Sequence, residues 1–570
     1  MSPFPLPCST IGQARSRWVD RFVGRSLSRV LVVGALLAPA AQGAPQLPTA
    51  PEPAENPWTR EKARLGKILF WEEQLSSTHT VACATCHRPS SGFADPRTIL
   101  DPEASRYFGT DRTHHTGDDV LGSRAMPLLG PDGTFRQRAD VGFGVMRTRR
   151  NAPTVLNAAY APALFWDGRA SGEFRDPVTG EVISASGAAL EAQVLEPLLS
   201  HFEMSAPGRI IEDLAAHLRV ITPLAEASHL PAPIALWTAG RGYPELFGEA
   251  FGDDSIQPRH IAQALATYIR TLVTRDLPVD RYLAGDITAL SDQERRGFDL
   301  FEGAAGCADC HGAPHFTDFG FHNLGVDPVF DDGGRREVTG LLADRGKFKT
   351  PSLRGVELTA PYFHDGSAMS LEDVVAFYDQ GGLHDAPNKA AEMVPLGLTP
   401  QEQADLVAFM KRPLTDPRVE AAVSPFDGPR LFSESRRVPA RFGQGTPGSG
   451  GHEPTIHLVE GLQEGQAVTV GIQGALGGAL GILYVGQGQG PIDSAVGGTI
   501  LYFRPGPGTH RTPMALEGSG EGAGHATLRF DMASMPSAIV GSRLIFQWIV
   551  DDPTPGRRFA ATRAISAVVY

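Results

Sequence analysis

Residues 83–87 (Cys-Ala-Thr-Cys-His) and 307–311 (Cys-Ala-Asp-Cys-His) are two copies of one pattern, Cys-x-x-Cys-His. In this pattern, two thiols can bond to the vinyl groups of a haem, and the adjacent histidine can bind its iron. The chain has five cysteines, and the two copies use four of them. We therefore expect two covalently bound haem c groups, one for each copy. The six residues that would hold them are Cys83, Cys86, His87, Cys307, Cys310 and His311.

Other uses of paired cysteines fit this sequence less well. A zinc ribbon places its two Cys-x-x-Cys pairs about 15–20 residues apart, whereas these pairs lie more than 200 residues apart. A thioredoxin-like redox centre needs one such pair between a strand and a helix, not two pairs that each precede a histidine. Two local disulfides would need neither histidine.

The composition of the chain limits the classes of function. The chain has 570 residues, with 51 Lys and Arg against 64 Asp and Glu, which gives a net charge of −13. Since neutralising phosphates requires a basic surface, the acidic balance excludes nucleic acid as the main partner. The 42% hydrophobic content is ample for packed cores and excludes a largely disordered chain.

Residues 1–43 have the layout of a secretory signal peptide. Five arginines precede the short apolar run 30–38, and small residues follow it at 40–44. The run is shorter than the ~20 residues that span a bilayer. We therefore expect export to the periplasm and no membrane span in the mature chain. The fifth cysteine, Cys8, would be removed with the signal peptide.

The pattern of apolar residues separates a helical part from a strand-rich part. Residues 260–272 and 371–378 have helical patterns, and the pairs Ser291/Glu294 and Thr399/Glu402 are typical of helix N-terminal capping boxes. After residue 456, short β-type runs alternate with turns rich in Gly and Pro. These runs are 467–472, 482–485, 499–503, 526–530, 544–550 and 565–570.

The expected fold is multi-domain, with two mostly α-helical c-type cytochrome domains followed by an all-β domain, a β-sandwich. The expected divisions are a signal peptide 1–43, a linker 44–57, an N-terminal cytochrome c domain 58–245, a C-terminal cytochrome c domain 246–415, a linker 416–456 and a β-sandwich domain 457–570.

Six short segments resemble motifs of the bacterial di-haem cytochrome c peroxidases, in the order of that family and over residues 60–415. They are 65–70 (Leu-Gly-Lys-Ile-Leu-Phe), 150–154 (Arg-Asn-Ala-Pro-Thr), 165–169 (Phe-Trp-Asp-Gly-Arg), 203–204 (Glu-Met), 348–354 (Phe-Lys-Thr-Pro-Ser-Leu-Arg) and 359–367 (Thr-Ala-Pro-Tyr-Phe-His-Asp-Gly-Ser). The resemblance implies a di-haem enzyme that reacts with peroxide.

The resemblance implies roles for residues near the first motif. His87 would be the proximal ligand of the peroxide-reacting haem. Glu203 would stand on the open face of that haem, where a carboxylate can move a proton between the peroxide oxygens. Trp166 would lie between the haems as an electron relay. From the sequence alone, Glu203 could instead be a surface acid, and the indole of Trp166 could serve in packing as well.

Asn151, with the backbone carbonyls of Thr359 and Pro361, resembles the family's Ca²⁺ site between the two haem domains. Oxygen ligands suit this hard cation. The alternative is that these groups only make loop hydrogen bonds.

The second haem is the informative case. His311 would be its proximal ligand, but where the peroxidases have a Met in the following helix this chain has Tyr378. A tyrosine here resembles the methylamine-utilisation (MauG-like) branch, whose enzyme oxidises residues of a partner protein. Phenolate is a hard anionic ligand that favours ferric iron. Met369 and Met393 are alternative ligands, and Tyr378 could also only cap the core.

A second departure concerns residues 142–144 (Gly-Phe-Gly). Peroxidases that need reductive activation carry a removable distal histidine in a Gly-His-Gly segment here. Phe143 cannot bind iron, so we expect the first haem to be open without prior reduction. Met146 is the alternative ligand for the first haem. His114 and His115 are expected to be loop histidines.

Three functions remain compatible with these residues. The first is a periplasmic di-haem peroxidase that reduces hydrogen peroxide with electrons from a small redox protein, a cytochrome c or a cupredoxin. The second is a MauG-like oxidase that modifies a partner protein through a high-valent haem. The third is a non-catalytic electron-transfer cytochrome. The β-domain has no catalytic constellation and is expected to serve in interaction or anchoring, with surface histidines His452, His457, His510 and His525.

Overall fold

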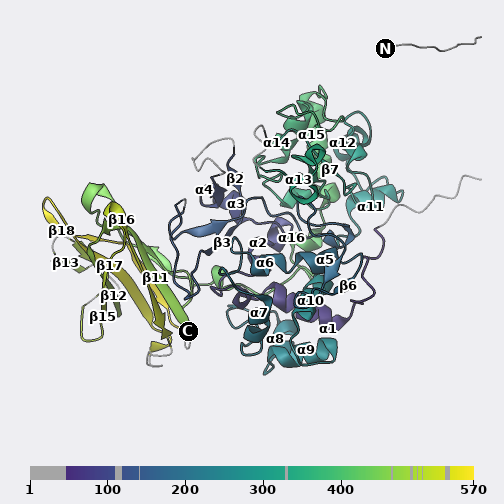
Figure 1. Ribbon diagram of the computed structural model, residues 1–570. Coiled ribbons are helices and arrows are strands. Elements are labelled where there is room, and N and C mark those ends of the chain that lie inside the picture. Colours follow the sequence, from purple (N-terminus) through teal and green to yellow (C-terminus); the bar gives the residue numbers. More distant parts are fainter. Residues whose placement is uncertain are drawn as a thin grey trace, which may run out of the picture. The chain divides into compact units, whose positions relative to one another are not determined.

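The computed structural model of the chain describes residues 47–108, 118–139, 141–327, 332–463, 466–487, 492–496, 499–503, 505–532 and 539–570. The predicted signal peptide with Cys8, and the histidines His114 and His115, lie outside the described residues. Figure 1 shows the helices of the earlier part, coloured purple to green, and the strands of the C-terminal part, coloured green to yellow. Among the described residues, no helix is long and apolar enough to cross a membrane.

A first group of helices packs around α1 (Arg60–Phe70) and α10 (Pro258–Ile269). The two helices approach closely at Gly66, where a Cβ atom would lie 1.9 Å from the backbone oxygen of Ala264. Only glycine permits this contact. Because α10 follows the predicted domain boundary at 245/246, residues on both sides of that boundary share one core. The group also contains α5 (Ala189–Gln193), α6 (Glu196–Leu199), α7 (Ile211–Leu218), α8 (Ala232–Thr238) and α9 (Tyr243–Phe251).

A second group packs around α12 (Asp292–Glu302) and α15 (Pro400–Met410). The two helices again approach closely at a glycine, because a Cβ atom on Gly297 would lie 2.0 Å from the backbone oxygen of Asp405. The core of this group is rich in aromatic rings, including Phe301. The group also contains α11 (Pro278–Leu283) and α14 (Leu371–Asp379).

The helix signals in the sequence are confirmed in these groups. The predicted helical patterns 260–272 and 371–378 correspond to α10 and α14. Both predicted capping boxes are formed, with Ser291 and Glu294 at the start of α12 and Thr399 and Glu402 at the start of α15. In each box, the hydroxyl accepts a backbone N–H and the glutamate accepts the N–H of the capping residue.

Short elements connect the helical groups. The short helices are η1 (Glu73–Leu75), α2 (Cys83–Cys86), η2 (Pro89–Ser91), α3 (Arg97–Leu100), α4 (Pro102–Ser105), η3 (Ala158–Tyr160), η4 (Cys307–Asp309), α13 (Arg336–Thr339), η5 (Leu342–Asp344), η6 (Val356–Leu358), η7 (Arg412–Leu414) and η8 (Phe432–Glu434). The strands pair as β1 (Arg106–Tyr107) with β2 (Val120–Leu121), β3 (Arg124–Pro127) with β4 (Val145–Arg147), β5 (Phe174–Arg175) with β6 (Val182–Ser184), and β7 (Phe321–His322) with β8 (Phe348–Lys349).

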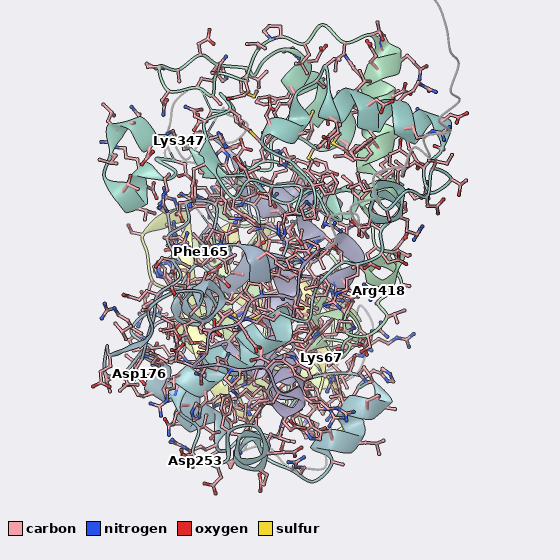
Figure 2. All side chains as sticks on the ribbon, turned by 90° about the vertical axis from the view of Figure 1, so that its right-hand side faces the viewer. Lys67, Phe165, Asp176, Asp253, Lys347 and Arg418 are labelled. Carbon is pink, nitrogen blue, oxygen red and sulfur yellow. The ribbon has the colours of Figure 1, made fainter. Side chains whose placement is uncertain are left out.

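The start of the predicted linker 416–456 is packed on the first group of helices. It begins with α16 (Pro417–Glu420), and Phe426 is fully buried in the core around α1. Asp427 forms an ion pair with Lys67 of α1, with a distance of 2.5 Å from Oδ1 to Nζ. Lys67 and Arg418 are both labelled in Figure 2. The chain therefore returns to its first helices before it enters the C-terminal strands.

The C-terminal part is rich in strands, as predicted. A three-stranded antiparallel sheet has the order β10-β11-β16, and a second sheet has the order β15-β12-β17-β19-β9 with β18 paired to β17. Side chains of β11 and β17 share one hydrophobic core, so the two sheets face each other. The strands are β9 (Ala440–Phe442), β10 (Thr455–His457), β11 (Ala467–Gly477), β12 (Leu480–Gln487), β13 (Ile492–Val496), β14 (Thr499–Leu501), β15 (His510–Ala515), β16 (Gly520–Asp531), β17 (Arg543–Thr554), β18 (Arg557–Ala561) and β19 (Ala564–Val568).

Each of the six predicted β runs overlaps a strand. The predicted linker 416–456 also supplies strand β9, which pairs with β19. One expectation is wrong: His457 is 7% exposed and is therefore not a surface residue. It is covered by aromatic rings from residues 135 and 143, far away in the sequence.

Candidate functional site

The first Cys-x-x-Cys-His motif lies on α2 and the turn that follows it. The ring nitrogen Nδ1 of His87 donates a hydrogen bond to the backbone oxygen of Phe93, at 2.9 Å. Burial lowers the pKa of His87, which favours the neutral imidazole. A neutral ring whose Nδ1–H is held in this way keeps its Nε2 lone pair available for a metal.

The charge of Glu203 acts on both thiols of the first motif. Its segment is joined to the loop before the motif, because Ser77 N donates to Met204 O at 2.9 Å. Burial raises the pKa of Glu203. Burial first, and the charge of Glu203 to a lesser extent, raise the pKa values of Cys83 and Cys86 to about 12. The segment of Glu203 is therefore attached to the loop that leads into the first motif.

The second motif is built on η4, and it repeats the local geometry of the first. The Nδ1 atom of His311 donates to the backbone oxygen of Phe316 at 3.0 Å. Burial lowers the pKa of His311 as well. The two motifs therefore present the same neutral, oriented imidazole.

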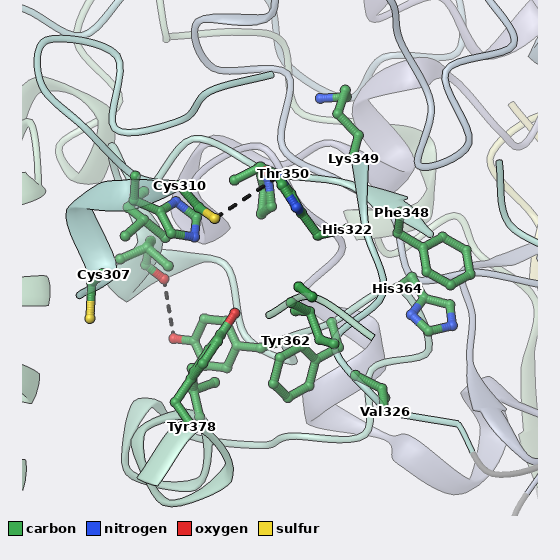
Figure 3. Close-up of a pocket in the computed structure, with 18 of the residues that line it drawn as sticks. Cys307, Cys310, His322, Val326, Phe348, Lys349, Thr350, Tyr362, His364 and Tyr378 are labelled. Atoms are coloured by element: carbon green, nitrogen blue, oxygen red, sulfur yellow. Dashed lines mark hydrogen bonds between the residues drawn. The ribbon is translucent and has the colours of Figure 1, made fainter. Parts of the chain in front are cut away.

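A cavity of about 230 Å³ lies beside the second motif. Cys307, Cys310 and His311 line it, together with Tyr378 of α14 and Met393. Most of its wall is apolar, with side chains such as those of residues 301, 353, 371 and 406. This donor set and lining fit a covalently attached haem. In Figure 3, Cys310 lies above the cavity and Tyr378 below it.

The candidate distal ligands of this cavity are not equivalent in the structure. Tyr378 and Met393 both line the cavity. Met369 does not, and its side chain is 37% exposed. Burial raises the pKa of Tyr378, so the phenol stays protonated unless a cation binds its oxygen.

Trp166 and Asn151, which follow β4 in the sequence, are part of the wall of this cavity. Trp166 Nε1 donates to Asn151 O at 2.8 Å, and Trp166 O accepts a hydrogen bond from Lys349 N at 2.7 Å. Both Trp166 and Asn151 line the cavity. Asn151 Nδ2 donates to the backbone oxygen of Pro361 at 2.6 Å, whereas its Oδ1 is buried without a hydrogen-bond partner. Thr359 lies in the same lining.

The segment that carries Phe143 contacts the C-terminal sheets. Phe143 is 2% exposed, and its backbone N–H donates to Gln473 Oε1 on β11 at 2.6 Å. Its ring packs against His457 and His525. Met146 is also buried, with Arg138 Nη1 3.8 Å from its sulfur. These contacts leave no local pattern in the sequence, because the residues they join are separated by over 300 positions.

Two further residues near the second motif, His322 and Lys349, were not predicted as site residues from the sequence. His322 Nε2 lies 2.8 Å from Asp318 Oδ2 and 3.9 Å from Cys310 Sγ. The hydrogen bond with Cys310 and the charge of Asp318 raise the pKa of His322 to about 9. Lys349 lines the cavity, and burial lowers its pKa to about 8. Lys349 lies inside one of the quoted family motifs, which was the only available signal.

Comparisons with known proteins identify relatives of this chain. A family model for di-haem cytochrome c peroxidases matches residues 60–288. The methylamine utilization protein MauG of Methylorubrum extorquens is 35% identical over 372 residues, which cover 65% of this chain and 82% of that protein. The cytochrome-c peroxidase IdrP1 of Denitromonas iodatirespirans is 31% identical over 449 residues, which cover 71% of this chain and 96% of that protein.

Cytochrome c551 peroxidase of Nitrosomonas europaea is 30% identical over 385 residues, which cover 67% of this chain and 88% of that protein. Among solved structures, a MauG-like protein associated with microbial copper homeostasis is 27% identical, with a TM-score of 0.45. The match covers 70% of this chain and 99% of that chain.

Proposed function

Because this chain belongs to the di-haem cytochrome c peroxidase family, we propose that it reduces hydrogen peroxide with electrons from a small redox protein, such as a cytochrome c or a cupredoxin. The observation that carries the proposal is the half-buried Glu203 carboxyl, whose segment is hydrogen-bonded to the loop that leads into the first Cys-x-x-Cys-His motif. Reducing one peroxide to two waters consumes two electrons and two protons. A half-buried acid with a raised pKa suits the proton part of this reaction.

Two haem c groups would be held by the two motifs, and when bound they supply the iron that reacts with peroxide and carries electrons. Cys83 and Cys86 would anchor the first, and His87 would bind its iron through Nε2. The second motif would do the same through His311. In both motifs, the hydrogen bond from Nδ1 to a backbone carbonyl orients the ring and selects the tautomer.

The other residues would move protons and electrons. Glu203 would accept a proton from one peroxide oxygen and return it to the other, which is general acid–base catalysis. Trp166 would relay electrons between the two haems, since its indole lines the second cavity and bonds to Asn151. Phe143 cannot bind iron, so the first haem would react without prior reduction.

The repeated helix crossings support two haem modules. α1 and α10 cross at Gly66, and α1 precedes the first motif in the sequence. α12 and α15 cross at Gly297, and α12 contacts η4 of the second motif. We place the division between the modules after α10, because α10 shares the core of α1. The C-terminal sheets would form a separate β-sandwich module, and residues 1–43 would direct export to the periplasm.

A second candidate function is a MauG-like oxidase that modifies a partner protein. The observation that favours it is Tyr378, which lines the second cavity where the peroxidases have a methionine ligand. The methylamine utilization protein MauG is among the relatives of the chain. A purely electron-transferring cytochrome is less well supported, because such a protein would not use the half-buried acid Glu203.

A Ca²⁺ ion would fit beside Asn151. Its buried Oδ1 atom has no hydrogen-bond partner, and Thr359 and Pro361, whose carbonyls would be further ligands, line the same cavity. Oxygen ligands of this kind suit calcium. Metal analysis of the purified protein should find calcium, and Asn151→Ala should lose it while keeping both haems. A calcium-free wild-type protein would overturn this site.

Steady-state peroxide turnover by the purified holoprotein tests the main proposal. Reduced cytochrome c should be oxidised by hydrogen peroxide without prior reduction of the enzyme. Electron paramagnetic resonance of the resting ferric protein should show one high-spin and one low-spin haem. Two low-spin signals would contradict an open first haem. Absent turnover with a reactive first haem would favour the protein-modifying oxidase.

A further inference from the structure

The outer face of the three-stranded sheet is buried, although it points away from the core between the sheets. Side chains alternate along β11, so Val468, Val470 and Ile472 enter the core. Thr469 and Gly471 must then point outward. Yet Thr469 is 0% exposed, and Gly471 is buried as well. Another part of the chain therefore covers this outer face.

The covering segment is the distal loop, which we define as residues 133–139 and 141–146. Thr469 Oγ1 donates to the backbone oxygen of Gly133 at 2.8 Å. Arg529 Nη1, on the neighbouring strand β16, donates to the same oxygen at 3.1 Å. At the other end of the loop, Gln473 Oε1 accepts the backbone N–H of Phe143 at 2.6 Å. Polar contacts therefore fix the loop at both ends.

Aromatic packing fills the space between these two ends. The ring centroids of Phe135 and Phe143 lie 5.9 Å apart. The ring centroid of Phe143 also lies 5.9 Å from those of His457 and His525. These rings reach the sheet because residue 471 has no side chain. A Cβ atom there would lie 2.8 Å from Phe135 and 3.1 Å from Phe143. The two phenylalanine rings therefore pack directly against the backbone of Gly471.

The distal loop also reaches the segment of Glu203. Arg138 and Gly142 bond to each other through both backbone groups, at 3.0 and 2.8 Å, so these two residues lie side by side. The guanidinium of Arg138 lies 5.9 Å from the ring centre of Phe202. Phe202 immediately precedes Glu203. A continuous set of contacts therefore connects β11 to the candidate proton-transfer residue.

We propose that the outer face of the three-stranded sheet is a positioning surface for the distal loop and, through Arg138 and Phe202, for Glu203. Thr469, Gly471, Gln473 and Arg529 would act as positioning residues at the first haem. The C-terminal module would then hold the peroxide side of that haem in one arrangement. This inference rests on the proposed function and assigns a task within it to the C-terminal sheets.

The substitution Gly471→Ala tests this surface with the full-length holoprotein. The added methyl group must displace Phe135 or Phe143, so amide hydrogen exchange in the distal loop should become faster. Because small misplacements of catalytic groups are costly, kcat/KM for peroxide should fall about 10-fold to 100-fold. The high-spin signal of the first haem should change, whereas the low-spin signal of the second should not. Gly508→Ala is the matched control, since a Cβ atom there meets open space.

A second pair of variants keeps the proposal testable if Gly471→Ala fails to fold. Gln473→Ala removes the acceptor for Phe143 N–H and should reproduce the effects on exchange, spin state and kcat/KM. Gln473→Glu keeps an acceptor oxygen and should restore wild-type behaviour. Gln487→Ala, on the exposed end of β12, is the control.

Two outcomes would overturn the proposal. Unchanged exchange in the distal loop would show that this face does not hold it. Faster exchange with an unchanged high-spin signal and unchanged kcat/KM would show that the loop does not position the site. Failure of the proposed function is a separate result, because it would appear as absent peroxide turnover in the wild-type protein. In that case, hydrogen exchange and the high-spin signal can still be compared between the wild type and the Gly471 and Gln473 variants.

Discussion

The two Cys-x-x-Cys-His motifs have nearly the same local structure but very different surroundings. In each, the histidine donates through Nδ1 to a backbone carbonyl five or six residues ahead, at 2.9 Å for His87 and 3.0 Å for His311. The first motif has a half-buried carboxyl, Glu203, on a segment that is hydrogen-bonded to the loop before the motif. The second has a mainly apolar cavity that contains the phenol of Tyr378.

This difference separates what binds a haem from what decides its reactivity. The thiols and the proximal histidine lie within five residues, so their geometry is set by short-range backbone structure. The groups that would face the other side of each haem come from remote segments. A mobile proton at Glu203 suits peroxide chemistry, whereas an anionic oxygen ligand at Tyr378 would favour ferric iron.

Removing the cysteines of one motif at a time should have the largest effect. Cys83→Ala/Cys86→Ala should leave one haem per chain and abolish every spectral response to peroxide. Cys307→Ala/Cys310→Ala should also leave one haem and no turnover, yet its remaining haem should still respond to peroxide. Haem content and stopped-flow absorbance measure both. Equal peroxide responses in the two variants would contradict the assignment of separate roles.

Loss of the carboxyl at the first motif should have the next largest effect. Glu203→Gln should lower kcat for peroxide reduction about 10²-fold to 10⁴-fold, because general acid–base catalysis contributes that much. Steady-state oxidation of reduced cytochrome c measures it. Glu212→Gln, at an exposed position on α7, is the control and should behave like the wild type. A loss below tenfold would place the proton transfer on another group.

The phenol at the second motif should affect spectra more than turnover. Tyr378→Phe should change only the low-spin signal in electron paramagnetic resonance, since Tyr378 lines the cavity beside the second motif, where it would face the second haem. Met393→Leu is the matched variant, because Met393 lines the same cavity. A signal that changes in Met393→Leu and not in Tyr378→Phe would assign the sixth ligand to the methionine.

The smallest expected effect is a shift in pH dependence at the first motif. Burial raises the pKa of Glu203, and the charge of Arg169 lowers it. The base form is therefore lost as pH falls through a pKa above the usual value of ~4.3, so the acid limb of kcat/KM should lie above that value. Arg169→Gln should move this limb to higher pH. Arg175→Gln, an exposed arginine, should not move it.

Much of the fold follows from short-range patterns. The capping boxes at Ser291 and Thr399 mark the starts of α12 and α15, because both partners of each box lie within four residues. The β-type runs after residue 456 overlap strands for the same reason. In contrast, the crossing of α10 on α1 could not be predicted, because it depends on the absence of a side chain at Gly66 facing a backbone oxygen at residue 264.

The candidate site divides in the same way. The sequence by itself determined the six haem-binding residues, because their chemistry depends only on a five-residue spacing. Only the tertiary structure decided which alternative ligands line the second cavity, excluding Met369 and keeping Tyr378 and Met393. It also buried His457, which the sequence placed on the surface. The physical reason is that burial and electrostatic coupling are set by segments distant along the chain, whereas covalent attachment depends on adjacent residues.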